Sequence, residues 1–219
     1  VKVPQPPYTQ GSQMQNIGSM ESKGWEFEVG GDIIRTKDFT WSSSMNLSHN
    51  TGKILTLEGD NSYHNGNGFV APGTPGDAAR MEAGSTIGSF YMWKFAGFDD
   101  EGSFLLYNKD GEVIPAAQKT ENDKQYIGNY TPKLIIGWSH TLTYKNFDLG
   151  INLRSWIDFD VYNTINMYYG IQGQGNLNVL KDAYGKFNHI KGEKQVCDYF
   201  LEDGTFLKID AITLGYTLP

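Results

Sequence analysis

Residues 39–50 read Phe39-Thr-Trp-Ser-Ser-Ser-Met-Asn-Leu-Ser-His-Asn50, and two kinds of side chain alternate along them. One set is bulky and apolar: Phe39, Trp41, Met45 and Leu47. The other is polar and uncharged: Thr40, Ser42, Ser44, Asn46, Ser48 and Asn50. Because successive side chains of a strand point to opposite sides, the stretch predicts a ribbon with one apolar face and one uncharged polar face. Small hydroxyls and amides opposite large aromatics suit a barrel wall that meets lipid outside and water inside.

The same alternation runs longer from Phe147. Its apolar set is Phe147, Leu149, Ile151, Leu153, Ile157, Phe159 and Val161, interrupted at Ser155. Its other set is Asp148, Gly150, Asn152, Arg154, Trp156, Asp158 and Asp160. We expect one strand over 147–161, well beyond the usual length of about 5–6 residues and closer to a tilted transmembrane strand.

Two further runs follow this rule. Apolar residues from Leu134 to Tyr144 alternate with glycine, serine and threonine, and Lys145-Asn146 predicts a tight hairpin into the next strand. Trp25, Phe27 and Val29 alternate with two glutamates before a short turn at 36–38. A soluble all-β sandwich also alternates, so the pattern by itself leaves both architectures open.

The predicted organisation is uneven. Strands are expected at 24–35, 38–50, 87–97, 133–145, 146–162 and 204–218, with a short candidate at 102–107. Tight turns alternate with long polar segments at 51–86, 108–132 and 163–203, which include glycine-rich stretches at 60–76 and 170–176. Soluble domains rarely carry several loops longer than about 12–15 residues, whereas outer-membrane barrels combine short turns with long loops. Strands 87–97 and 133–145 would run the same way, so the 102–107 segment is expected to lie between them.

Composition sets limits on function. The chain has 219 residues, five Trp, thirteen Tyr and twelve Phe, an aromatic content that suits barrel girdles, glycan-binding clefts or ordinary cores. A net charge of −7 argues against nucleic acid as a partner. No run approaches the roughly 18 apolar residues of a membrane helix, a test that barrel strands escape. The single Cys197 excludes an internal disulfide and is expected to be structural.

Residues 1–8 lack the basic start and apolar core of a signal peptide, and the chain stops at what reads as a strand end. We therefore expect residues 1–219 to be an internal piece of a larger protein.

Four ordered motifs carry a family resemblance. Residues 16–28 (Asn-Ile-Gly-Ser-Met-Glu-Ser-Lys-Gly-Trp-Glu-Phe-Glu) and 38–50 resemble consecutive strands of SusC/RagA-type TonB-dependent outer-membrane transporters. Residues 127–133 (Ile-Gly-Asn-Tyr-Thr-Pro-Lys) followed by 142–149, and 199–208 followed by 212–219 (Ile-Thr-Leu-Gly-Tyr-Thr-Leu-Pro), resemble later barrel signatures. The matches occur in the family's order from about Asn16 to Pro219.

The resemblance implies an all-β fold, with antiparallel strands from the C-terminal half of a 22-stranded transmembrane barrel with long extracellular loops. It implies import of an oligosaccharide or peptide across the outer membrane of a Gram-negative, Bacteroidota-like bacterium. It also implies a SusD-like surface lipoprotein and TonB as partners. The plug domain and the segment that contacts TonB have no counterpart in this chain.

Paired carboxylates do not predict catalysis. Glu26 and Glu28 lie on one face of one strand, whereas a glycosidase needs carboxylates on opposite sides of a sugar. Asp158 and Asp160 have the same arrangement, and Arg154 is expected to pair across the wall. Residues 108–112 (Asn-Lys-Asp-Gly-Glu) predict an Asp-Gly turn rather than a calcium loop, because the acidic end positions are absent. The four His residues are scattered, and we predict no enzyme, cofactor or metal.

Aromatic residues give the candidate substrate contacts. Trp156 sits on the polar face of its strand, where it would pack against the wall or a plug, or stack on a sugar or peptide. With Arg154, Asp158, Tyr162, Tyr168 and Tyr169 it forms the predicted lumen or rim site, although the tyrosines also suit an aromatic girdle. Trp41, Trp93 and Trp138 are expected to face lipid or its interface. Two other classes stay open: a soluble β-rich glycan-binding module and a passive porin.

Overall fold

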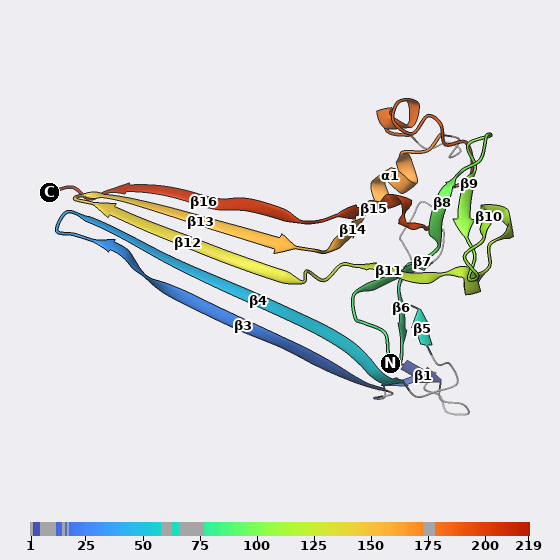
Figure 1. Cartoon of the computed structure of the whole chain (residues 1–219), viewed down its shortest axis with the longest axis horizontal. Helices are drawn as coiled ribbons and strands as arrows, with labels where there is room; N and C mark the ends of the chain where they lie inside the picture. The colour runs from blue at the N-terminus through green and yellow to red at the C-terminus, as the bar shows by residue number, and fades with distance from the viewer. Residues whose placement is uncertain are drawn as a thin grey trace.

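The computed structural model describes residues 2–4, 12–14, 16, 18–57, 63–65, 77–172 and 178–219. The fold is all-β and antiparallel, with long strands that extend from a compact part at one end (Figure 1). The long strands are β3 (Gly18–Arg35), β4 (Phe39–Leu57), β12 (Leu134–Tyr144), β13 (Phe147–Ile157) and β16 (Phe206–Tyr216).

These strands form one sheet in the order β16-β13-β12-β4-β3, with every neighbouring pair antiparallel. The turn between β3 and β4 is closed by a hydrogen bond from the Thr36 amide to the Phe39 carbonyl, 2.8 Å. Between β12 and β13, Tyr144 pairs with Phe147, and Lys145 takes the left-handed conformation (φ 51°) that such short hairpins require. Both predicted turns are confirmed.

The chain leaves this sheet twice, both times at the end opposite the turns (Figure 1). Residues 58–133 connect β4 to β12, and residues 158–205 connect β13 to β16. β4 therefore pairs directly with β12, and the prediction that 87–97 and 102–107 continue the wall is wrong. Their apolar side chains are buried inside the compact part, which is why they alternate like wall strands without belonging to the wall.

Small sheets build the compact part. β7 (Ser89–Met92) pairs with β11 (Gln125–Asn129), and β8 (Lys94–Phe98), β9 (Phe104–Tyr107) and β10 (Val113–Pro115) form a three-stranded sheet. Two-stranded pairs join β14 (Asp160–Tyr162) to β15 (Leu201–Asp203), and β5 (Tyr63–Asn65) to β6 (Arg80–Glu82). β1 (Lys2–Pro4) pairs with β2 (Ser12–Met14).

Short helices complete it: α1 (Thr164–Tyr169) and the 3-10 turns η1 (Ala116–Gln118), η2 (Glu121–Asp123), η3 (Lys181–Tyr184) and η4 (Asp198–Phe200). The segment 163–203, predicted as a polar loop, thus contains α1, η3 and η4. Among the described residues, no helix has the length and apolar character needed to cross a membrane. The glycine-rich stretch at 60–76 lies mostly outside the described residues, as do 173–176.

The two segments that leave the sheet, residues 58–133 and 158–205, are called the two excursions below. One hydrophobic core joins them. The first contributes Met92, Trp93, Phe104 and Leu106, and the second Tyr162, Met167, Tyr168, Ile171, Phe187, Ile190, Val196, Cys197 and Phe200. An isolated parallel bridge between Trp93 and Cys197 ties them at the backbone, with Trp93 donating to the Val196 carbonyl at 3.3 Å. The predicted polar segment 163–203 therefore folds onto residues that the sequence predicted as strands 87–97 and 102–107.

β13 is shorter than predicted. It ends at Ile157, and Asp158 takes a positive φ of 58°, which turns the chain out of the sheet. The Asp158 amide bonds the Thr205 hydroxyl at 3.0 Å, and the chain resumes as β14 against β15. A single strand over 147–161 is therefore wrong, because a non-glycine residue in the left-handed region cannot continue a pleated ribbon.

Gly102 offers a test of the core. Both Gly102 (φ 83°) and Gly111 (φ 82°) need a left-handed backbone, but an added Cβ at Gly102 would collide with the His189 carbonyl oxygen, whereas Gly111 faces open space. Gly111→Ala should cost about 1–2 kcal/mol from the backbone alone. Gly102→Ala should cost more and make 77–203 cleavable by added protease while Gly111→Ala stays resistant. Equal resistance of both variants would contradict this packing.

Candidate functional site: the two faces of the long sheet

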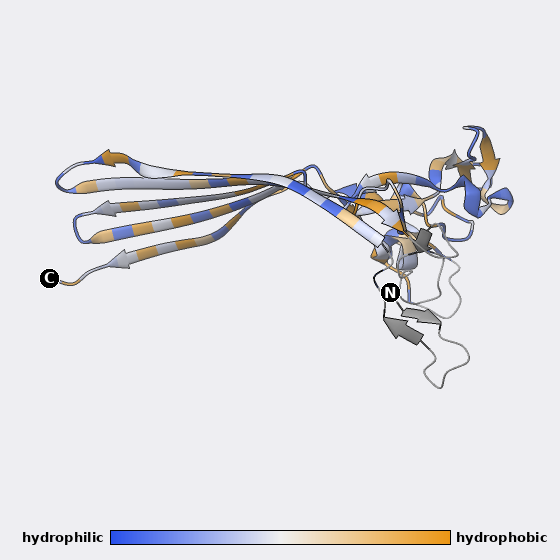
Figure 2. Ribbon diagram, turned by 90° about the horizontal axis from the view of Figure 1, so that it is seen from below, coloured by the Kyte–Doolittle hydropathy of each residue, from blue (hydrophilic) through white to orange (hydrophobic). Residues whose placement is uncertain are grey.

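The register sorts side chains into transverse rows across the five strands. One face carries Val29, Met45, Trp138, Leu153 and Ile209 in one row, and Ile34, Trp41, Leu142, Leu149 and Leu214 in another. Next to the turns a row of four aromatics crosses the sheet: Phe39, Tyr144, Phe147 and Tyr216. Phe147 and Tyr216 touch, with ring centroids 4.7 Å apart. The alternation appears as bands of opposite hydropathy along the ribbons (Figure 2).

The opposite face is polar. Asp32, Ser42, Thr141, Gly150 and Thr213 form one row, and Glu28, Asn46, Gly137, Arg154 and Lys208 another. Glu26 and Glu28 are both exposed on it, as predicted. Polar side chains on this face form hydrogen bonds with one another: the Ser42 hydroxyl, for example, donates to the Asp32 carboxylate at 2.6 Å.

Arg154 belongs to a charged cluster on this face. Its Nη2 lies 3.3 Å from the Asp210 carboxylate, and the Lys208 Nζ lies 3.5 Å from the same oxygen. Asp210 is the extra residue of a β-bulge in β16, and the bulge turns its carboxylate to the side of the arginine. Arg154 therefore pairs across the wall, as predicted, with an aspartate of the neighbouring strand. The two nearby aspartates have other partners: Asp158 bonds Lys133 at 2.6 Å, and Asp160 accepts from the Asn129 amide at 2.8 Å.

Trp156 lies between polar residues in the sequence, but in the fold it has two aromatic neighbours. It lies in register with Ile135 and Phe206, and its ring stands 5.6 Å from that of Phe206 and 5.9 Å from that of Phe159. The polar face therefore becomes aromatic near the compact part. Within the described residues, Trp156 Nε1 and Arg154 Nε are shielded from solvent and have no hydrogen-bond partner. Such donors cost about 1–3 kcal/mol each, so an acceptor brought here would stabilise the pair.

The three predicted rim tyrosines lie away from this face, in the compact part. Tyr162 and Tyr168 are buried, with 8% and 3% of their surface exposed, and Tyr169 packs against the same core. Burial raises the pKa of both Tyr162 and Tyr168. As placed, they are core residues that a ligand cannot reach, and substrate contact at Tyr169 stays a prediction.

Trp93 is also a core residue, and its predicted place at a lipid interface is wrong. Only 4% of it is exposed, and its indole donates to the Thr120 carbonyl at 2.9 Å. The ammonium groups of Lys119 and Lys124 lie 4.9 and 4.4 Å from its ring. Desolvation lowers the pKa of Lys119. Trp41 and Trp138 do lie on the apolar face, with Trp138 42% exposed.

Cys197 and the 108–112 turn are structural, as predicted. The thiol is fully buried, and burial raises the pKa of Cys197 to about 12, so it is unreactive. At the turn, the Asn108 side chain accepts from the amides of Asp110 and Glu112 at 3.0 and 2.8 Å. These two hydrogen bonds to the Asn108 Oδ1 stabilise the turn of the β9–β10 hairpin. Over the described ranges, no cluster of three or more His, Cys, Asp or Glu is placed to hold a metal.

Known proteins are similar in sequence to nearly the whole chain. A TonB-dependent receptor of Formosa agariphila, P3, is 28% identical over 95% of the chain and 23% of its own length. The TonB-dependent receptor SusC of Bacteroides thetaiotaomicron is 29% identical over 99% of the chain and 22% of its own length. The chain is similar to part of a SusC-type TonB-dependent receptor. It spans about a quarter of the length of these relatives, and no protein-family profile matches it.

Solved structures show the same fold. The RagAB peptide transporter matches with a TM-score of 0.72 and 24% identity over 99% of the chain and 25% of the matched chain. The RagAB peptide importer in its open-open state matches with a TM-score of 0.74 and 24% identity, over 100% and 25% respectively. The resemblance predicted from four motifs is confirmed, and the SusC/RagA-type barrel wall is the fold of this chain.

The Arg154 partner can be tested by a double-mutant cycle. Both side chains are partly exposed, so Arg154→Gln and Asp210→Asn should couple by about 0.2–1 kcal/mol in the free energy of unfolding. The matched cycle of Arg154→Gln with Asp158→Asn should show no coupling. Denaturant titration of the purified protein measures both, and a larger coupling to Asp158 would contradict the register of β13 and β16.

Proposed function

We propose that residues 1–219 form part of the C-terminal half of a 22-stranded barrel in a TonB-dependent importer of the outer membrane. One observation carries the proposal: a single-layer sheet has one face of continuous apolar rows that the described part of the chain leaves uncovered. Large side chains on these rows are open to the surroundings, with Ile212 63% and Leu214 72% exposed. A Gram-negative, Bacteroidota-like bacterium is the expected host, as for the relatives.

The height of the apolar face is close to that of the apolar band of outer-membrane barrels, which supports its placement in a bilayer. From the Phe39 row to the Trp25–His49 pair, β4 advances from residue 39 to residue 49. Ten steps at about 3.4 Å give about 34 Å along the strand. A tilt of about 45° reduces this to about 24 Å, close to the apolar band of about 25 Å in outer-membrane barrels.

Aromatic residues mark the border of that band. The row of Phe39, Tyr144, Phe147 and Tyr216 lies beside the two tight turns, where a girdle meets the headgroups. The tight turns would then lie on the periplasmic side, and the compact part on the extracellular side.

The polar face would line the water-filled interior. Its candidate substrate contacts are Trp156 and Arg154, together with Asp158 at the border of the compact part. An indole beside a guanidinium suits an oligosaccharide or a peptide, since both offer hydrogen-bond acceptors and flat apolar surfaces. RagAB is a peptide transporter, which supports the peptide among these two substrate classes.

The partners we propose are a SusD-like surface lipoprotein over the extracellular part and TonB, reached through an N-terminal part of the whole protein. Both relatives are TonB-dependent receptors, which supports TonB as a partner. The role proposed here is binding and transport, without catalysis or a cofactor.

A soluble β-rich glycan-binding module is the second candidate. Such a module would need a second layer over the apolar rows, because contiguous exposed patches of this extent are rare in soluble proteins. The residues buried in the core all lie outside those rows: Phe39, Trp41, Ile151 and Leu153 are not among them. The uncovered face therefore favours the barrel wall.

A cysteine scan along β13 tests the proposal. Cysteines that replace Asp148, Gly150 and Asn152 should react with a water-soluble maleimide in the outer membrane of intact cells. Cysteines that replace Leu149, Ile151 and Leu153 should not react, because lipid covers them. Nitroxides at the same positions should show the reverse pattern for oxygen collisions. Buried Cys197 provides an unreactive background. Equal labelling of both sets would favour the soluble module.

Trp156 gives a test of the substrate site. Trp156→Ala should lower uptake of the transported oligosaccharide or peptide by about tenfold, the effect of losing one stacking contact of about 1–1.5 kcal/mol. Trp156→Phe should retain most uptake, and Trp138→Ala on the opposite face serves as the control. Uptake must be normalised to the amount of protein at the cell surface. Unchanged uptake in Trp156→Ala would remove Trp156 from the site.

A further inference from the structure

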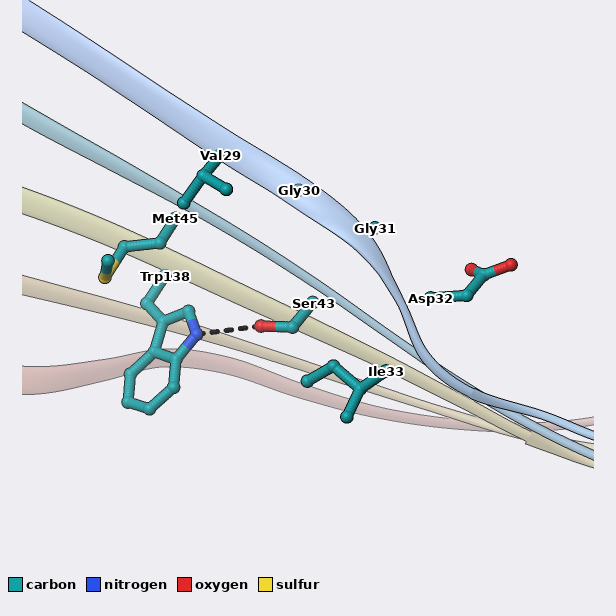
Figure 3. Close-up of a pocket in the computed structure, with 8 residues that line it drawn as sticks. All are labelled: Val29, Gly30, Gly31, Asp32, Ile33, Ser43, Met45 and Trp138. Carbon is teal, nitrogen blue, oxygen red and sulfur yellow. Dashed lines mark hydrogen bonds between the residues drawn. The ribbon is translucent and has the colours of Figure 1, made fainter.

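A hollow of about 390 Å³ lies on the apolar face, beside the β3 edge of the sheet (Figure 3). It is lined by Val29, Gly30, Gly31, Asp32, Ile33, Ser43, Met45 and Trp138. In Figure 3 the side chains of Val29, Met45, Trp138 and Ile33 surround it, while the Asp32 carboxylate is directed away. That carboxylate is engaged by Ser42 and Arg35.

The hollow results from two small residues, Gly31 and Ser43, that are neighbours in one transverse row. Gly31, Ser43 and His140 align between the Met45–Trp138 row and the Trp41–Leu142 row. A Cβ added at Gly31 would meet no atom within 4 Å. A bulge between Asp32 and Ile34 inserts Ile33, which closes the hollow toward the turns.

Polar groups in and beside the hollow already have partners. The Trp138 indole donates to the Ser43 hydroxyl at 2.9 Å, and the Trp41 indole donates to His140 Nδ1 at 3.3 Å. Each tryptophan thus supplies a donor to a polar side chain on the apolar face. The walls of the hollow present carbon and sulfur, so it is suited to hydrocarbon.

Depth restricts what can enter. Ser43 lies four residues from Phe39 along β4, about 14 Å along the strand and about 10 Å below the aromatic row after tilt. If the apolar face meets the bilayer, this level is within the hydrocarbon, where acyl chains are the abundant molecules.

We propose that the hollow binds one acyl chain of a membrane lipid, with Gly31 as its floor and Trp138 as its wall. The inference rests on the proposed membrane orientation. Association inside a bilayer depends on van der Waals packing, and an acyl chain in the hollow contacts walls that a flat surface lacks. Its volume exceeds the roughly 150 Å³ cavity that is enough for benzene in another protein.

Photo-crosslinking tests the site in the full-length protein, reconstituted with a phospholipid that carries a diazirine in its acyl chain. Mass spectrometry should find labels on Met45 and Trp138 several-fold more often than on Leu149 and Leu214 of the same face. Gly31→Leu fills the hollow and should remove this excess. Gly150→Leu is the matched control: its Cβ is also unobstructed but lies on the polar face, so labelling should not change.

The outcomes separate this inference from the proposed function. Uniform labelling of the apolar face would overturn the acyl-chain site and leave the membrane orientation intact. The same conclusion would follow if labels appeared everywhere on that face except the hollow, because a neighbouring strand would then cover the hollow. An apolar face without labels would overturn both. A persistent excess at Trp138 in Gly31→Leu would also contradict the site.

Discussion

Backbone pairing in register is the constraint on which the two-faced sheet depends. Side chains alternate with a period of two, so a slip of one residue between β4 and β12 would place Trp138 and Leu142 among the serines of the polar face. Three bulges, one each in β3, β4 and β16, restore the alignment where the sequence would drift. In lipid the same hydrogen bonds are obligatory, because no water can satisfy a free amide or carbonyl.

That constraint explains the polar residues tolerated on the apolar face. Ser43 and His140 interrupt the rows at a level where an unsatisfied polar group costs most. Each accepts a hydrogen bond from an indole of a neighbouring row, so the two tryptophans satisfy these polar groups on the apolar face. The aromatic residues at the border are instead Phe39, Tyr144, Phe147 and Tyr216.

Sequence reasoning recovered the wall because its signal is local. Alternation and two turns predict β12, β13 and β16, and they predict β3 and β4 except for residues 18–23 and 51–57. Four ordered motifs predict the family resemblance. It failed in the excursions, where period-two patterns such as those around Met92 and Phe104 report burial in a compact core just as they would report a wall. The partner of Arg154 could not be named because a bulge carries Asp210 to its side, and no side-chain pattern predicts a bulge. The density of aromatics at 90–107 and 187–200 was the overlooked signal of a second core.

The two excursions are coupled to the wall where they leave it. The Lys133 amide donates to the Ile157 carbonyl at 3.0 Å, and Gly204 donates to Phe159 at 2.8 Å, so β12, β13 and β16 enter the compact part already fixed to one another. Trp93 and Cys197, from different excursions, meet in the shared core. Neither excursion can bury its apolar residues alone. A shift of one excursion would therefore disturb both the shared core and the end of the sheet where Trp156 and Arg154 lie.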